Sequence, residues 1–109
     1  MRILAHIHTH NEAEVIERAL AALQRQTRPP DAIVIVDNLS TDGTLDRIFP
    51  ESVTLIRNPE LGIAGSVAIG LAHALKEKFD WTWVLDADSV PESDALANLL
   101  SFFLSLIHI

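Results

Sequence analysis

Cysteine is absent from this sequence of 109 residues, and basic residues are scarce. Without cysteine, the chain can form neither a disulfide framework nor a cysteine-ligated zinc or iron–sulfur site. The 8 lysine and arginine residues face 15 aspartate and glutamate residues, which gives a formal net charge of -7. This balance argues against a nucleic-acid-binding protein, because such proteins present a basic surface to the phosphates.

Long apolar runs are also missing. No stretch reaches the roughly 18 residues that a membrane-spanning helix needs, and the first residues do not resemble a secretory signal. We therefore expect a cytoplasmic location, with peripheral contact of the full-length protein with the inner face of the membrane as an alternative. Apolar residues make up 49% of the chain, which is enough to bury a core. The length corresponds to one domain.

Strand-like and helix-like segments alternate four times along the chain. Apolar runs rich in β-branched residues predict strands, and apolar spacings of three and four residues predict helices. The predicted strands cover residues 3–7, 32–36, 53–56 and 81–85. The predicted helices cover residues 12–26, a short segment ending near Phe49, residues 67–79, and a last segment from about Ser89 to the end. This alternation predicts a Rossmann-like three-layer α/β/α fold with a mainly parallel sheet and four β-α units.

The helical spacing also predicts which side chains face the sheet. Three are expected from helix 12–26: Ile16, Leu20 and Leu23. Four are expected from helix 67–79: Val67, Leu71, Ala74 and Leu75. In the last helix we expect Pro91 in the first turn, with Glu92 and Asp94 near the positive end of the helix dipole.

Polar and acidic residues gather where each predicted strand ends. Ligands of open parallel sheets bind at the carboxyl ends of the strands, so a site is expected in these loops. The loops are Thr9-His10-Asn11-Glu12, Asp37-Asn38-Leu39-Ser40-Thr41-Asp42-Gly43-Thr44, Asn58-Pro59-Glu60-Leu61-Gly62-Ile63-Ala64-Gly65 and Asp86-Ala87-Asp88-Ser89. A carboxylate after the second strand can accept hydrogen bonds from a base or ribose. Two carboxylates one residue apart can bind a hard divalent cation, and that cation could neutralise a diphosphate leaving group.

Taken together, the four loops resemble the motifs of glycosyltransferase family 2, which has the GT-A fold. Residues 26–44 are similar to the second-strand signature of that family. The first loop resembles its Thr-aromatic-Asn-Glu motif, with His10 at the aromatic position. The third loop resembles its glycine-rich loop but is one residue short before Leu61, and Asp86-Ala87-Asp88 resembles its Asp-x-Asp motif. The resemblance covers residues 2–103 and implies an incomplete GT-A domain that contains the nucleotide-binding half.

The resemblance also implies a role for each matching residue. Four residues would line the base and ribose pocket: Thr9, His10, Asn11 and Glu12. Asp37 would bind the base or ribose, with Asn38 beside it. Asp86 would lie near the ribose and the metal, and Asp88 would ligate Mg²⁺ or Mn²⁺ on the diphosphate. The implied reaction transfers a sugar from a nucleoside diphosphate, UDP- or dTDP-linked, to a glycan, lipid or other acceptor. No residue matches a catalytic base.

The last six residues, 104–109, resemble the translation of a sequencing-library adapter. We therefore expect the native partial domain to cover residues 1–103, with different residues after Phe103 in the gene. The alternative is a natural apolar helix end. Because the acceptor-binding half and the base would follow residue 103, we expect the chain alone to be inactive.

Three other functions are compatible with parts of the sequence. His6, His8 and His10 alternate on one strand, as in some metal-dependent hydrolases, although such a site needs further ligands from later strands. Asp86-Ala87-Asp88-Ser89-Val90 fits the motif of haloacid dehalogenase-type phosphotransfer enzymes, but that motif belongs on a first strand. The third alternative is a non-catalytic nucleotide-binding module.

Overall fold

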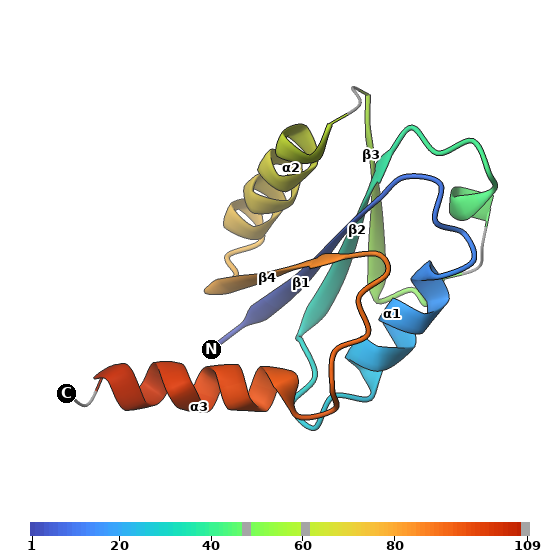
Figure 1. The fold of residues 1–109 in the computed structure, drawn as a ribbon. Coiled ribbons are helices and arrows are strands. Elements are labelled where there is room, and N and C mark those ends of the chain that lie inside the picture. Colours follow the sequence, from blue (N-terminus) through green and yellow to red (C-terminus); the bar gives the residue numbers. More distant parts are fainter. Residues whose placement is uncertain (47–48, 60–61, 108–109) are drawn as a thin grey trace.

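The computed structural model describes residues 1–46, 49–59 and 62–107. Glu60 and Leu61 of the third loop, and His108 and Ile109 of the tail, lie outside the described residues. Four parallel strands form one sheet in the order β3-β2-β1-β4, as Figure 1 shows. The strands are β1 (Ile3–Thr9), β2 (Ala32–Asn38), β3 (Val53–Asn58) and β4 (Trp81–Asp86). The predicted parallel sheet is confirmed.

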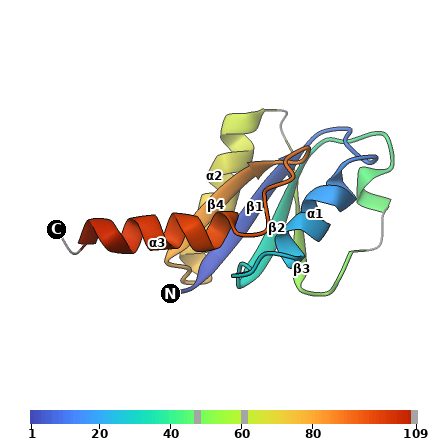
Figure 2. The ribbon, with the colours of Figure 1, turned by 60° about the horizontal axis from the view of Figure 1, so that its bottom comes forward.

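Helices cover both faces of the sheet, which gives the predicted three layers. They are α1 (Ile16–Gln24), α2 (Ile63–Lys76) and α3 (Ala95–Ile107). In the described part of the link from β2 to β3, the 3-10 turn η1 (Thr44–Asp46) is the only helical element. Helix α2 lies on one face, and α1 and α3 lie on the other (Figure 2). None of the helices in the described part of the chain is long and apolar enough to cross a bilayer.

Apolar residues of β1 and β2 are buried on both faces, which explains their continuous apolar runs. On the α1 face, Ala5, Ile7 and Ile35 pack with Ile16 and Leu23 of the helix. The predicted inward face of α1 is confirmed. A second core forms under α2 and contains Leu4, Val34, Val36 and Ala74.

The predicted inward face of α2 is wrong for two leucines. Leu71 is 45% exposed and Leu75 is 80% exposed, whereas Gly70 and Ala74 are buried. The reason is the close approach of the helix to β1. A Cβ atom added to Gly70 would lie 2.6 Å from Nδ1 of His6, so no side chain fits at this position against the sheet.

The last helix begins later than predicted, because Gln26 holds the preceding segment in another conformation. The buried Gln26 side chain donates from Nε2 to the Glu92 carbonyl at 2.6 Å and accepts from the Leu96 N–H at 3.1 Å. Pro91, Glu92 and Asp94 therefore precede α3 instead of forming its first turn.

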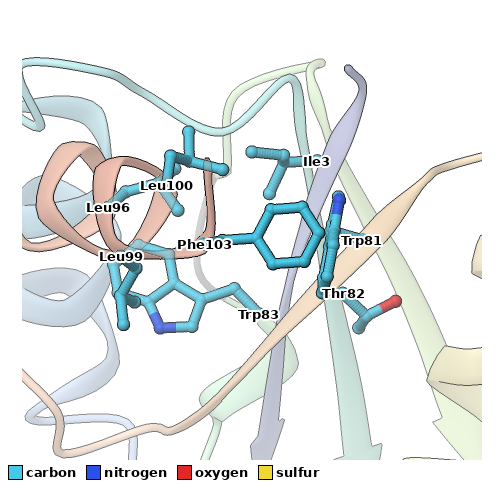
Figure 3. Close-up of a pocket in the computed structure, with 8 residues that line it drawn as sticks. All are labelled: Ile3, Trp81, Thr82, Trp83, Leu96, Leu99, Leu100 and Phe103. Carbon is cyan, nitrogen blue, oxygen red and sulfur yellow. The ribbon is translucent and has the colours of Figure 1, made fainter. Parts of the chain in front are cut away.

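Helix α3 packs against the sheet through aromatic rings and runs on through residue 104 to Ile107. The rings of Trp81 and Phe103 meet edge to face, with centroids 4.4 Å apart. Figure 3 shows these rings beside Ile3 and Trp83 in an apolar cavity of about 210 Å³. The contact fixes α3 near the amino ends of β1 and β4, away from the loops that carry the predicted site.

Candidate functional site

The predicted site loops follow the carboxyl ends of parallel strands, and these ends lie at one edge of the sheet. The order β3-β2-β1-β4 places β2 and β4 on opposite sides of β1. The chain leaves β1 through α1 on one face and returns to β4 from α2 on the other face (Figure 1). Such a change of direction opens a crevice in an α/β sheet, and ligands bind there.

The loops after β1 and β2 are joined by hydrogen bonds. The Thr41 N–H donates to Oδ1 of Asn11 at 2.7 Å, and the Asn11 N–H donates to Oγ of Ser40 at 2.9 Å. Asn11 adopts a φ of 51°, in the left-handed region that asparagine tolerates better than most residues. The two predicted binding loops therefore form one connected rim.

Asp42 adds a second link between these loops. The Thr44 hydroxyl donates to its carboxylate, and the Ala13 N–H donates to Oδ2 at 3.1 Å. The Thr44 hydrogen bond, followed by the backbone hydrogen bonds from Ala13 and Thr44, lowers the pKa of the Asp42 carboxyl below its ordinary value. Asn11, Glu12 and Asp42 line an open pocket of about 350 Å³ at this rim.

The four residues of the first predicted motif have different environments. Thr9 is buried, and its hydroxyl lies 3.4 Å from Oε1 of Glu12, which also accepts from the His10 N–H at 3.1 Å. His10 is exposed, and its Nδ1 lies 2.5 Å from the Asn38 carbonyl oxygen. His10 and Asn11 are therefore the motif residues most open to a ligand, while Thr9 and Glu12 support the loop.

Asp37 is fully buried at the end of β2. Its Oδ2 accepts from the Ser40 N–H at 3.0 Å, and its Oδ1 accepts from the Ser40 hydroxyl at 2.5 Å. A carboxylate has about four acceptor positions, so these two bonds leave capacity for a further donor. The residue shapes the loop and could also receive a hydrogen bond from a ligand that reaches it.

Asn38 is buried in a polar network that no pattern in the sequence predicts. Its Oδ1 accepts from Nδ2 of Asn58 at 2.8 Å and from the Ser66 hydroxyl at 2.5 Å. These contacts join the ends of β2 and β3 to the first turns of α2. The family resemblance implies a place for Asn38 in the nucleotide site, and in the structure its side chain supports the rim.

Asp86 is the last residue of β4, and Asp88 lies in the turn that follows, where the Ser89 N–H donates to the Asp86 carbonyl at 3.0 Å. Oδ1 of Asp86 lies 2.7 Å from Nε2 of His8, and the Asp86 side chain is 69% exposed. Asp88 is also exposed, and its carboxylate has no hydrogen-bond partner among the described residues. The alternation of histidines along the first strand suggested His8 as a possible metal ligand, and no pattern in the sequence indicated its contact with Asp86.

The donor set fits a divalent cation that arrives together with a phosphate ligand. Exposed carboxylates are hard oxygen donors, and Mg²⁺ in proteins is commonly held by one or two carboxylates and substrate phosphates. The described residues contain no group of three or more His, Cys, Asp or Glu side chains arranged around a common metal position. Asp86 and Asp88 alone would therefore leave coordination positions for phosphate and water.

The same geometry does not favour a histidine-based hydrolase centre. His6 is fully buried, and burial followed by the nearby His8 lowers its pKa to about 4. Neither of its ring nitrogens has a hydrogen-bond partner among the described residues. The Nε2 atom of His8 already contacts Oδ1 of Asp86, so it is not free to bind a metal ion. Asp86 itself lies on the last strand of the sheet in chain order, unlike the nucleophile of a haloacid dehalogenase-type enzyme.

Comparison with known proteins gives consistent matches over nearly the whole chain. The model of glycosyl transferase family 2 matches residues 5–106. Galactofuranosyltransferase GlfT1 of Mycobacterium tuberculosis is 34% identical over 108 residues, which cover 91% of this chain and 34% of GlfT1. The undecaprenyl-phosphate mannosyltransferase of Micrococcus luteus is 31% identical over 92% of this chain and 43% of its own length. The chain thus spans between about one third and less than half of the length of these relatives.

Two solved structures have a similar fold. The mannosyltransferase PcManGT of Pyrobaculum calidifontis, in complex with GDP-Man and Mn²⁺, superposes with a TM-score of 0.79 at 33% identity. The match covers 91% of this chain and 31% of PcManGT. Residues 1–349 of S. aureus TarS, in complex with UDP, also give a TM-score of 0.79, at 20% identity over 96% of this chain and 32% of that protein. At that identity, the TarS match supports the fold.

Proposed function

This chain belongs to glycosyltransferase family 2, and from that membership we propose that it is the donor-binding half of a sugar-transferring enzyme. The donor would be a nucleoside-diphosphate sugar. The observation that carries the proposal is the position of exposed Asp86 and Asp88 at the crevice edge, beside the connected loops after β1 and β2. A nucleotide in the crevice would have polar loops on one side and carboxylates on the other.

Individual residues would have different roles in nucleotide binding. His10 and Asn11 would contact the base or ribose from the open rim, and Asp37 would accept a hydrogen bond with its remaining lone pairs. Thr9, Glu12 and Asn38 would keep the loops in place. We propose UDP or dTDP as the nucleotide, with GDP as the alternative because PcManGT was solved with GDP-Man.

Asp86 and Asp88 would hold Mg²⁺ or Mn²⁺ against the diphosphate. When bound, the cation neutralises the phosphate charge and stabilises the diphosphate as a leaving group. A chain with a formal net charge of -7 would otherwise repel a nucleotide diphosphate, so the cation also removes a barrier to association. Mn²⁺ is the first ion to test, because PcManGT was solved with it.

Calorimetric titration of the full chain with UDP, dTDP and GDP, with and without MnCl₂, tests this proposal. We expect nucleotide binding that needs the cation and that EDTA reverses. Asp88→Asn should weaken binding by about tenfold or more, since it removes a charged ligand. The matched control is Asp94→Asn, which changes the same charge at an exposed position before α3. Metal-independent binding that Asp88→Asn leaves unchanged would refute the assignment.

We also propose that the chain needs further residues for turnover. Glu92 and Asp94 lie in the segment that the Gln26 side chain holds near the end of α1 by a hydrogen bond to the Glu92 carbonyl. Neither carboxylate therefore lies at the carboxyl ends of the strands, where a catalytic base would be needed. A radiolabelled-donor assay on the purified chain should detect no transfer and no donor hydrolysis above background. Measurable turnover would contradict this.

The proposed boundary after Phe103 has a separate test. An independent long-read sequence of the gene should show different residues after this position. A stop codon directly after Ile109 would make residues 104–109 native and would overturn the adapter interpretation.

A further inference from the structure

His8 and Asp86 face each other across the junction of the two strands that border the crevice. They are register partners on the neighbouring parallel strands β1 and β4, so their side chains project from the same face of the sheet. Nε2 of His8 lies 2.7 Å from Oδ1 of Asp86. The His8 side chain is 13% exposed and that of Asp86 is 69% exposed. The contact therefore links a nearly buried ring to a carboxylate at the surface.

The ring of His8 packs against the ring of His6. His6 lies two residues earlier on the same face, and the two imidazole centroids are 6.0 Å apart in an edge-to-face arrangement. His6 is in turn confined by α2, because the backbone at Gly70 lies so close that a Cβ there would contact the ring at 2.6 Å. Gly70, His6 and His8 thus form a packed series that ends at Asp86.

Among the described residues, Asp86 is the one polar partner of the His8 side chain. Its Nδ1 is buried and has no hydrogen-bond partner among the described residues. A carboxylate oxygen only accepts, so Nε2 must carry the proton that is shared with Oδ1. The contact fixes the rotamer of an exposed aspartate that would otherwise sample several, and it leaves Oδ2 as the oxygen free to bind a ligand.

We propose that His8 is a positioning residue that orients the Asp86 carboxylate toward the divalent cation and the donor diphosphate. This inference rests on the proposed function. His8 itself touches neither the cation nor the nucleotide. Its contribution is to present one aspartate oxygen in a fixed direction, so that the oxygen does not have to be ordered when the ligand binds.

Three single variants test the proposal by their affinity for Mn²⁺ in the presence of saturating UDP or GDP. Free Mn²⁺ is counted by electron paramagnetic resonance. His8→Leu removes the donor at similar volume and should weaken Mn²⁺ affinity about tenfold, the cost of losing a hydrogen bond to a charged group. His8→Gln restores an N–H donor at the position of Nε2 and should stay within about threefold of the wild type. His73→Leu, on α2, is the control for the loss of a histidine.

A double-mutant cycle distinguishes positioning from a general structural effect. In an Asp86→Ala background, His8→Leu should cause no further loss of Mn²⁺ affinity, because its only route to the cation has been removed. A second readout needs no metal. The ¹⁵N resonance of His8 Nε2 should shift on Asp86→Ala in the metal-free chain and remain in place on Asp88→Ala. Urea unfolding of each variant checks that it is folded.

The possible results separate the two proposals. If the wild-type chain binds Mn²⁺ no better with the nucleotide than without it, the proposed function fails, and this inference fails with it. If the wild type binds and His8→Leu stays within twofold of it, only the role of His8 is overturned. The role is equally overturned if the loss caused by His8→Leu persists undiminished in the Asp86→Ala background.

Discussion

The buried ring of His6 makes the stability of this chain sensitive to mild acid. The side chain is fully buried, and both of its ring nitrogens lack hydrogen-bond partners among the described residues. Burial, with a further contribution from the charge of His8, lowers its pKa from 6.5 to about 4. The folded chain therefore holds His6 neutral, whereas the unfolded chain protonates it at pH values below about 6.5.

The size of the effect follows from proton linkage. Because the folded-state pKa is the lower one, the stabilisation is complete above pH 6.5 and is lost as the pH falls toward 4. With values of 6.5 and about 4, a change from pH 8 to pH 5 costs about 2 kcal/mol of unfolding free energy. The carboxyl groups of Asp31 and Asp42 have pKa values below 3.8 and do not titrate in this window.

Urea unfolding at pH 8 and pH 5, followed by the fluorescence of Trp81 and Trp83, measures the loss. The wild type should lose about 2 kcal/mol between these pH values. His6→Val, which places an apolar β-branched residue in the strand, should lose much less. His73→Gln should behave like the wild type. If His6→Val retains the full loss, the acid sensitivity arises elsewhere and the reasoning about His6 is refuted.

Three further predictions use the same unfolding measurement at pH 8. Gly70→Ala should destabilise the wild type by about 1–3 kcal/mol through its clash with His6. In a His6→Ala background the same substitution should stabilise the chain, because alanine has the higher helix propensity. Destabilisation in both backgrounds would contradict the clash. Gln26→Ala should cost about 2 kcal/mol because its partners lose buried hydrogen bonds, and a neutral result would show that α3 does not depend on it. Phe103→Ala should cost about 1–2 kcal/mol through the lost contact with Trp81, and Phe102→Ala, at an exposed position, serves as its control.

Periodicity in the sequence predicted the elements whose apolar residues face a core. The strands β1 and β2 were found because their buried runs have few polar interruptions, and the inner face of α1 was found because its large apolar residues repeat at helical spacing. On α2, Ala74 was predicted correctly, but Leu71 and Leu75 were placed inward wrongly because the buried residues of this helix are small. A stripe of Ser66, Gly70 and Ala74 carries almost no hydrophobic signal, whereas Leu71 and Leu75 carry a strong one.

Contacts between distant segments could not be predicted from spacing. The start of α3 depends on the Gln26 side chain, which lies far away in the sequence. The pairing of His8 with Asp86 depends on the register of β1 against β4. The Asp86-Ala87-Asp88 motif was visible in the sequence because its residues are adjacent. The residue that orients it was not, because no local pattern identifies a partner on another strand.

The order of the strands has a consequence for folding. β1 is the first of the four strands in chain order, and it pairs with β4, the fourth. Close to the start of both strands, Oδ2 of Asp80 accepts a hydrogen bond from the Arg2 N–H, which is 78 residues away in the sequence. During synthesis, β1, β2 and β3 are complete before β4 emerges, so one edge of β1 stays unpaired until then. Closing a loop of this length is slow compared with forming local structure. The junction of His8 and Asp86 is therefore expected to form late, after most of the hydrophobic core is available to guide β4 into register.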